Sequence, residues 1–315
     1  MHQSTSVRRS DYRALEATDR LFLWIVYGAA GFFILLVVLL FLQLLHGSEL
    51  SLKAFGLKFL WTSEWNPVAS RFGALPLIFG TVASSLIAIV LAGIVGIFGA
   101  TYLADFAPKR IDRILSFAIE LLAAVPSVVY GLWGLFVLAP LMRDHIGPSL
   151  QRVLGFLPLF SGPIYGVGLL TAGMILALMI LPTVTAISRD VIVAVPREQR
   201  EGSMALGATR WETITRIVLP AARAGIFGAL VLALGRALGE TIATTMVIGN
   251  RPEIAASLFA PSYTLSSVIA NEFTEATTDV YISALVELGL LLFVVSFVVN
   301  GLARIMMGTL FRRRG

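Results

Sequence analysis

Arg236 and Glu240 stand inside an apolar run from about residue 222 to residue 249, and their types and spacing could support chemistry. A charge at the centre of a membrane helix costs at least ~2.5–3.5 kcal/mol, so such a residue usually has a use. An arginine stays charged when buried, and its planar fork can bind an oxyanion through two hydrogen bonds. A glutamate four residues later on a helix lies on the same face, where it could orient the arginine, neutralise it or accept a proton. The alternative is an ion pair that serves helix packing alone.

The composition indicates an all-α, polytopic membrane protein. Of 315 residues, 57% are hydrophobic and 14% are charged, and the apolar residues are gathered in long blocks. Six runs have the length that a membrane-spanning helix needs: about 22–45, 74–103, 114–142, 163–188, 222–249 and 282–307. The third and fourth runs contain Pro126 and Pro182, and each proline predicts a kink or a break. Cysteine is absent and the three histidines are isolated, so we expect no metal site and no thiol chemistry.

The basic residues predict the orientation. With the N-terminus inside, 17 of the 24 lysines and arginines fall on inner segments and six on outer segments, with Arg236 as the remaining one. The prediction is a multi-pass protein of the cell inner membrane with both termini in the cytoplasm. It divides the chain into an N-terminal arm (1–21), a first span (22–45), an outer loop (46–73), a core (74–307) with a cytoplasmic loop at 189–221, and a basic tail (308–315).

The longest inner loop, PREQREGSMALGATRWETITRIVLPAA from Pro196, predicts two short helices. Pro196 suits a first helical position and Gly207 the residue just past a helix end. Thr209 and Glu212 form a capping-box pattern, and we expect Pro220 to close the second helix before the fifth span. A DNA-binding helix-turn-helix is excluded because spans on both sides hold the segment at the membrane. An amphipathic helix on the inner leaflet, a plain connector and a docking site for a partner remain open.

The same loop resembles the EAA loop of ABC importer permeases. The match follows E-x5-G-x9-I-x-L-P and falls on Glu201, Gly207, Ile217, Leu219 and Pro220. The sequence departs from the usual pattern at residues 202 and 203, which are glycine and serine where many members have two alanines.

This resemblance implies that the loop docks in a groove of an ATPase subunit and transmits its closure to the membrane helices. The implied coupling residues are Glu201 and Gly207, with Arg200, Ala205 and Leu206 as contacts. The chain has no G-x-x-x-x-G-K-[ST] motif, so a separate ATPase would bind ATP and Mg and this chain needs no cofactor of its own.

A longer resemblance points to the PstC-type permeases of bacterial phosphate importers. Segments in family order span about residues 20–308: FLWTSEW (59–65), IELLAAVPSVVYGLWGLF (119–136), ISRDV (187–191), GRALGET (235–241), VIGN (247–250) and ANEF (270–273). The resemblance implies an ABC type I importer permease fold and a transport subunit for inorganic phosphate that is not an enzyme. It further implies a second homologous permease, two ATPase subunits, an extracytoplasmic phosphate-binding protein, membrane lipid around the chain, and no nucleic acid.

The implied substrate path runs through Arg236 and Glu240, and we expect Glu120 and Ser127, beside the Pro126 break, to contribute to it. Glu287 in the sixth run is expected to pair structurally, for example with an arginine of a partner subunit. Loop 250–281 carries four acidic residues against one arginine and is expected to dock the binding protein. Sulfate or molybdate import, an ion-gradient-driven transporter, and a non-transporting scaffold or sensor are the alternatives.

Overall fold

The computed structural model describes residues 9–311 of the chain, with the side chains of residues 19–306 and 308. The chain forms two units, one ending at Gly47 and the other beginning at Ser48. The first unit contains α1 (Arg9–Gly47), which from Asp19 onward is long and apolar enough to cross a membrane. The first predicted span, 22–45, lies within this helix. The helix extends back into the predicted N-terminal arm, whose residues 1–8 lie outside the described residues, as do residues 312–315 of the predicted tail.

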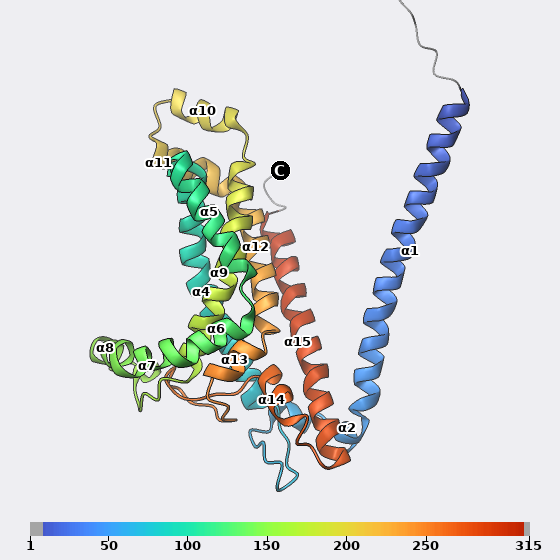
Figure 1. Ribbon diagram of the computed structural model, residues 1–315, viewed down its shortest axis with the longest axis vertical. Coiled ribbons are helices and arrows are strands. Elements are labelled where there is room, and N and C mark those ends of the chain that lie inside the picture. Colours follow the sequence, from blue (N-terminus) through green and yellow to red (C-terminus); the bar gives the residue numbers. More distant parts are fainter. Residues whose placement is uncertain (1–8, 312–315) are drawn as a thin grey trace, which may run out of the picture. The chain divides into compact units, whose positions relative to one another are not determined.

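Four long helices form the framework of the second unit (Figure 1). They are α4 (Leu75–Thr101), α9 (Leu169–Val193), α12 (Leu219–Leu238) and α15 (Asp279–Phe311). α4 packs chiefly on α9, and α12 contacts α4, α9 and α15. Small residues allow this close packing: a β-carbon at Gly96 of α4 would lie 2.8 Å from Val184 Cγ1 of α9.

The all-α membrane fold is confirmed, but the third predicted span is not one crossing helix. Within residues 9–311, five helices are long and apolar enough to cross a membrane, and a sixth span exists only if a pair bent by 96° is counted as one. The bent pair consists of α5 (Lys109–Ala124) and the helical stretch from Ser127 to Leu154, which begins with α6 (Ser127–Trp133). Pro126 causes the bend, because it lacks a backbone N–H and forces Val125 into an extended conformation.

The fourth and fifth predicted spans also differ from the structure. α9 begins only at Leu169, and it continues through Pro182 without a break in the helix. The fifth span is interrupted: α12 ends at Leu238, and α13 (Ile242–Val247) begins after residues 239–241. We call these three residues the 239–241 break.

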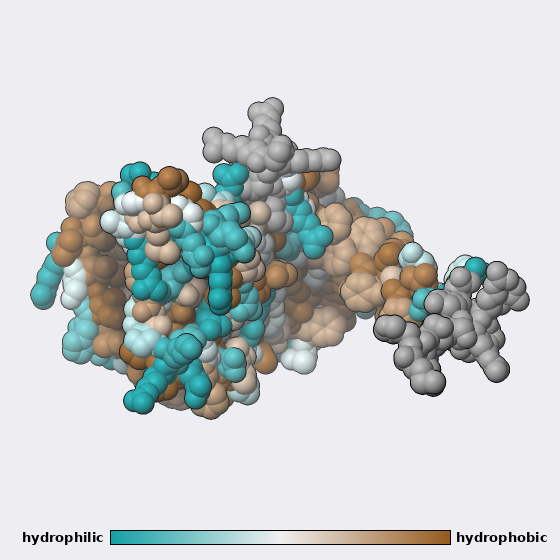
Figure 2. Space-filling model, turned by 90° about the horizontal axis from the view of Figure 1, so that it is seen from above, coloured by the Kyte–Doolittle hydropathy of each residue, from teal (hydrophilic) through white to brown (hydrophobic). Residues whose placement is uncertain are grey.

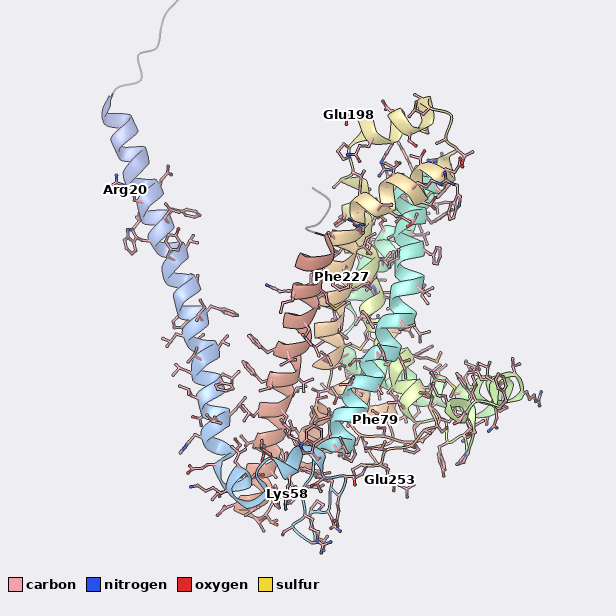
Figure 3. The ribbon with its side chains drawn as sticks, turned by 180° about the vertical axis from the view of Figure 1, so that it is seen from behind. Arg20, Lys58, Phe79, Glu198, Phe227 and Glu253 are labelled. Carbon is pink, nitrogen blue, oxygen red and sulfur yellow. The ribbon has the colours of Figure 1, made fainter. Side chains whose placement is uncertain are left out.

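The shorter elements gather at two ends of the second unit (Figures 1 and 3). One end, the α10 end, carries α10 (Arg197–Ala205), α11 (Arg210–Thr213) and the π-helical η5 (Ile214–Val218). The opposite end, the α14 end, carries α2 (Glu49–Phe55), α3 (Lys58–Trp61) and α14 (Leu265–Glu272). Figure 3 places Glu198 at the α10 end, and Lys58 and Glu253 at the α14 end. The remaining elements are η1 (Tyr102–Phe106), η2 (Gly134–Leu138), α7 (Ala139–Leu141), η3 (Met142–Ile146), α8 (Gly147–Leu154) and η4 (Pro158–Phe160).

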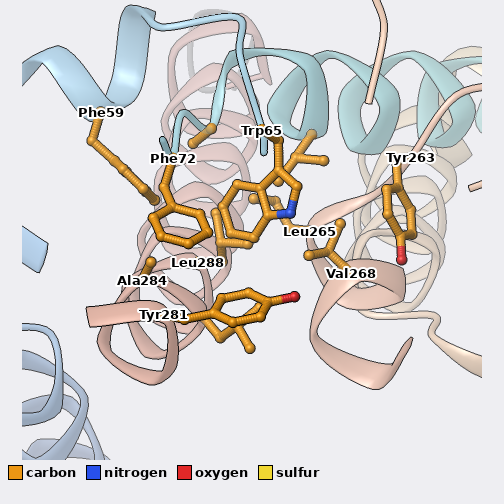
Figure 4. Close-up of a cluster of buried hydrophobic side chains, with 12 residues drawn as sticks. Phe59, Trp65, Phe72, Tyr263, Leu265, Val268, Tyr281, Ala284 and Leu288 are labelled. Carbon is orange, nitrogen blue, oxygen red and sulfur yellow. The ribbon is translucent and has the colours of Figure 1, made fainter. Parts of the chain in front are cut away.

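An aromatic cluster organises the α14 end (Figure 4). The Phe72 ring lies 5.0 Å from the Trp65 ring and 5.1 Å from the Tyr281 ring, on which it stacks. Glu272 accepts hydrogen bonds from Trp65 Nε1 (2.8 Å) and Tyr281 Oη (2.6 Å). This carboxylate therefore serves the packing of three segments, whereas the sequence suggested that it would face outward as part of an acidic docking loop.

Candidate functional site

The 239–241 break changes the expected geometry of Arg236 and Glu240. Arg236 lies in the last turn of α12, whereas Glu240 lies beyond the end of that helix. Glu240 Oε1 instead accepts a hydrogen bond from the backbone N–H of Ala243 (3.1 Å) in the first turn of α13. The prediction that the two residues share one helical face is therefore wrong, and the described residues form no Arg236–Glu240 ion pair.

Hydroxyl groups from α14 and from α13 itself hold the break in place. Ser266 Oγ of α14 donates to the Glu240 carbonyl oxygen (2.8 Å), and Thr244 Oγ1 donates to the same oxygen (3.2 Å). α14 is in turn attached to α4, because the N–H of Leu265 donates to Thr81 Oγ1 (2.9 Å). Sequence reasoning missed Ser266 and Thr81. A local signal for the start of α14 was Thr264, its N-cap, whose hydroxyl accepts a hydrogen bond from the N–H of Ser267.

Arg236 is exposed in this chain, and none of the described residues forms an ion pair or a side-chain hydrogen bond with it. It lies three residues before the 239–241 break, and α13, beyond the break, packs on α6, which carries Tyr130. Tyr130 Oη donates to the Leu122 carbonyl oxygen (2.8 Å) and so joins the two sides of the Pro126 bend. An unpaired guanidinium thus stands beside the point where two broken spans meet.

Ser127, the first residue of α6, is brought to this meeting point by helix packing. α6 packs on α13, which directly follows the break. The contact is close: a β-carbon at Gly131 would lie 2.5 Å from Met246 Sδ. The structure therefore places the helix of Ser127 against the helix that Glu240 caps.

Glu120 lies elsewhere, on the exposed side of α5. It lines an open cleft of about 590 Å³ between α5 and α9, on the α10 side of the bend. The lining residues are Lys109, Asp112, Arg113, Ser116, Phe117, Glu120 and Arg189. Among the described residues Glu120 has no ion-pair partner. The structure does not bring Glu120 to the 239–241 break.

Glu287 is buried within this chain and is 3% exposed. It lies in α15, on which α2 packs, and its Oε2 has no hydrogen-bond partner in the described part of the chain. An arginine from a partner subunit could not reach a side chain that this chain already covers. The expectation of pairing with a partner subunit does not fit this position.

The loop at the α10 end folds largely as the sequence indicated. α10 starts after Pro196, Gly207 has a positive φ of 89°, and Thr209 and Glu212 form the complete capping box. Pro220 does not close the second helix, because it lies in the first turn of α12 and the helical stretch continues from Arg210 to Leu238. The preceding π-helical turn, η5, supplies the transition.

Exposure separates the predicted coupling residues into two groups. Glu201, Ala205 and Gly207 are exposed, and Leu206 is 92% exposed. Arg200 points inward: its side chain is 17% exposed and forms an ion pair with Asp105, whose side chain is 10% exposed. Arg200 thus ties α10 to η1, and its predicted contact with a partner stays a prediction.

The α10 end presents a mainly hydrophilic face, seen from above in Figure 2. Three large apolar side chains nevertheless protrude at this end, namely Met204, Leu206 and Trp211, which are 46%, 92% and 58% exposed. Exposed apolar residues rimmed by polar ones are typical of a surface that a partner covers.

Residues 92–310 match the model of a family described as the binding-protein-dependent transport system inner membrane component. The phosphate transport system permease protein PstC of Mesorhizobium japonicum is 46% identical over 314 residues, covering 98% of this chain and 96% of that protein. The corresponding protein of Haemophilus influenzae is 46% identical over 287 residues, covering 90% of each chain. This chain belongs to the PstC family of transport permeases.

A solved structure agrees with the fold of this permease. A bacterial ABC transporter involved in the import of the acidic polysaccharide alginate has a chain that superposes with a TM-score of 0.62 at 15% identity. The match covers 95% of this permease and 99% of that chain. The segment that matches the family model contains α5, the exposed loop around Gly207 and the 239–241 break, and it begins inside α4.

Proposed function

We propose that this permease is the transmembrane subunit of an ATP-driven importer of inorganic phosphate, and that Arg236 binds the ion on its way. The observation that carries the proposal is an unpaired arginine at a helix break in a membrane-spanning segment. A guanidinium is suited to phosphate because its fork donates two parallel hydrogen bonds. The printed names of the relatives, which are phosphate transport permeases, favour phosphate over sulfate or molybdate.

An energy source is required because the ion moves against the membrane potential. A membrane potential that is negative inside opposes each negative charge by ~2.3 kcal/mol per 100 mV. The chain carries no phosphate-binding loop of the ATPase type, so ATP and Mg belong to a separate ATPase and this permease is not itself an enzyme.

In this proposal Glu240 acts through the hydrogen bonds that shape the backbone at the 239–241 break. Its carboxylate caps α13 through Ala243, and its carbonyl accepts from Ser266, so it fixes the break beside Arg236. We further assign Ser127 to the same path, because α6 packs on α13. Glu120 belongs to a later part of the path.

The α10 end is assigned to the cytoplasm, and so are both termini. Two ATPase subunits serve the transporter, one docking on this chain over Glu201, Ala205, Leu206 and Gly207, and a second homologous permease completes the path. A phosphate-binding protein docks at the α14 end, outside the inner membrane. Lipid surrounds the spans, and no nucleic acid takes part.

The orientation can be tested with introduced cysteines, because the natural chain has none. Gly202→Cys at the α10 end should react with an impermeant thiol reagent only after the membrane is opened. Val68→Cys, at a position that is 98% exposed, should react from outside in intact cells. The opposite pattern would overturn the assignment of both ends.

The transport step can be tested in vesicles that contain the permease, its second permease and the ATPase, with labelled phosphate and the binding protein outside and ATP within. Arg236→Gln should abolish uptake while the complex still assembles, because a neutral amide cannot offset the desolvation of the anion. Arg236→Lys should retain little uptake, since a point charge lacks the fork. If Arg236 and Glu240 serve packing only, the doubly neutral variant should assemble and transport normally, and that result would refute the proposal.

A further inference from the structure

The cleft between α5 and α9 carries a regular polar stripe. Lys109, Arg113, Ser116 and Glu120 follow one another at intervals of four, three and four residues, which places them on one face of α5. All four line the cleft, and α9 contributes Arg189 from the other side. The neighbouring Arg110 is exposed but does not line the cleft.

The charges in the cleft leave two cations available. Arg189 Nη2 donates to both carboxylate oxygens of Asp112, at 2.9 and 3.0 Å, so that acidic residue is already neutralised. Lys109 and Arg113 have no ion-pair partner among the described residues. Cations near the N-terminus of a helix are unfavourable for the helix itself, so the two are not explained by the stability of α5.

The stripe leads toward the Pro126 bend. Its inner end, Glu120, lies two residues before Leu122, whose carbonyl oxygen accepts from Tyr130 Oη across the bend. Tyr130 belongs to α6, which packs on α13, the helix that follows the 239–241 break. α5 therefore runs from the Pro126 bend, beyond which α6 packs on α13, toward the α10 end.

We propose that Lys109 and Arg113 form a second oxyanion site, in the cleft that Arg189 lines from the other side, which takes a phosphate group at the α10 end. The site rests on the proposed function, because the ion it receives is the phosphate released from Arg236. Glu120 accepts a hydrogen bond from the protonated oxygen that phosphate keeps near neutral pH. The phosphate group of an anionic lipid has the same chemistry and is the other possible source.

The site can be tested by phosphate uptake into vesicles that hold the complete transporter, with Lys109→Gln/Arg113→Gln as the variant. Arg110→Gln is the matched control, because it removes a neighbouring charge outside the cleft. We expect the variant to lower the maximal rate of uptake at least about tenfold, because it removes two cations and the loss of one charge-assisted contact already corresponds to about that factor. The half-saturating phosphate concentration should stay unchanged, because it is set on the opposite side of the membrane. Arg113→Lys should keep most of the rate.

Two lipid compositions separate the sources of the phosphate group. A loss of rate in pure phosphatidylcholine vesicles as well as in vesicles with anionic lipid supports the transported ion as occupant. A loss only with anionic lipid supports the site with a lipid headgroup as occupant. A double variant that equals Arg110→Gln in both vesicles overturns the site while the proposed function stands. A wild-type complex that takes up no phosphate overturns both.

Discussion

Replacing Gly207 by alanine tests whether the turn at the α10 end transmits the ATPase cycle. Gly207 has a φ of 89°, and no heavy atom lies within 4 Å of the position that a β-carbon would take. The cost of Gly207→Ala is therefore one of backbone conformation, roughly 1–2 kcal/mol for an L-residue in a left-handed region. A cost of that size lowers the equilibrium ratio of the native turn to alternative conformations about 5- to 30-fold. If the ATPase binds only the native turn, its apparent affinity falls by up to the same factor.

Phosphate uptake and ATP hydrolysis, measured together in reconstituted vesicles, check this reasoning. Gly202→Ala is the control, because Gly202 lies within α10 with open space around it and alanine should stabilise that helix by about 1 kcal/mol. Gly207→Asn should lose less than Gly207→Ala, because asparagine tolerates the left-handed conformation better. A larger loss for asparagine than for alanine would refute the backbone argument and indicate that side-chain size at the docking surface matters instead.

Two further predictions concern the scaffold. Asp105→Asn should leave Arg200 inside the protein without its ion-pair partner and destabilise the α10 end by about 3–5 kcal/mol, whereas adding Arg200→Gln should recover much of that loss. The rate of protease cleavage after α10 in the purified protein measures the destabilisation and its recovery. Equal cleavage of the wild type and Asp105→Asn would contradict the prediction. Burial raises the pKa of Tyr263 from 10.0 to about 12, so the folded state favours the neutral phenol, and this contribution to stability is complete below pH 10 and is lost as the pH rises through 12. Thermal unfolding between pH 9 and 12 should therefore depend less on pH in Tyr263→Phe than in the wild type, and parallel curves would count against it.

The sequence allowed several local features to be predicted. The hydrophobic runs located the long helices, because the length of an apolar run is a direct requirement of crossing a bilayer. The positive φ of Gly207 and the capping box of Thr209 and Glu212 were also predictable, since each involves residues within one turn of each other. Pro126 predicted the bend because proline lacks the backbone N–H that a continuous helix would need at that position.

Features that depend on distant segments could not be predicted in this way. The apolar run 222–249 has the composition of one helix, yet its chain is broken at residues 239–241. The hydroxyl of Ser266, 26 residues further on, donates a hydrogen bond to the Glu240 carbonyl oxygen, and the Glu240 carboxylate accepts one from the backbone of α13. The interior position of Arg200 likewise depends on Asp105, which is 95 residues away.

The sequence by itself therefore determined an all-α membrane protein that resembles importer permeases, with a glycine turn at Gly207 and an arginine in its fifth apolar run. The tertiary structure decided which of the charged residues are free to act. Arg236 and Arg113 have no ion pair among the described residues. Arg200, in contrast, forms an ion pair within the chain, and Glu272 accepts two hydrogen bonds within it. The physical reason is that a charged side chain forms an ion pair or hydrogen bond with whatever group the fold brings within a few ångströms, and a linear sequence does not specify that group.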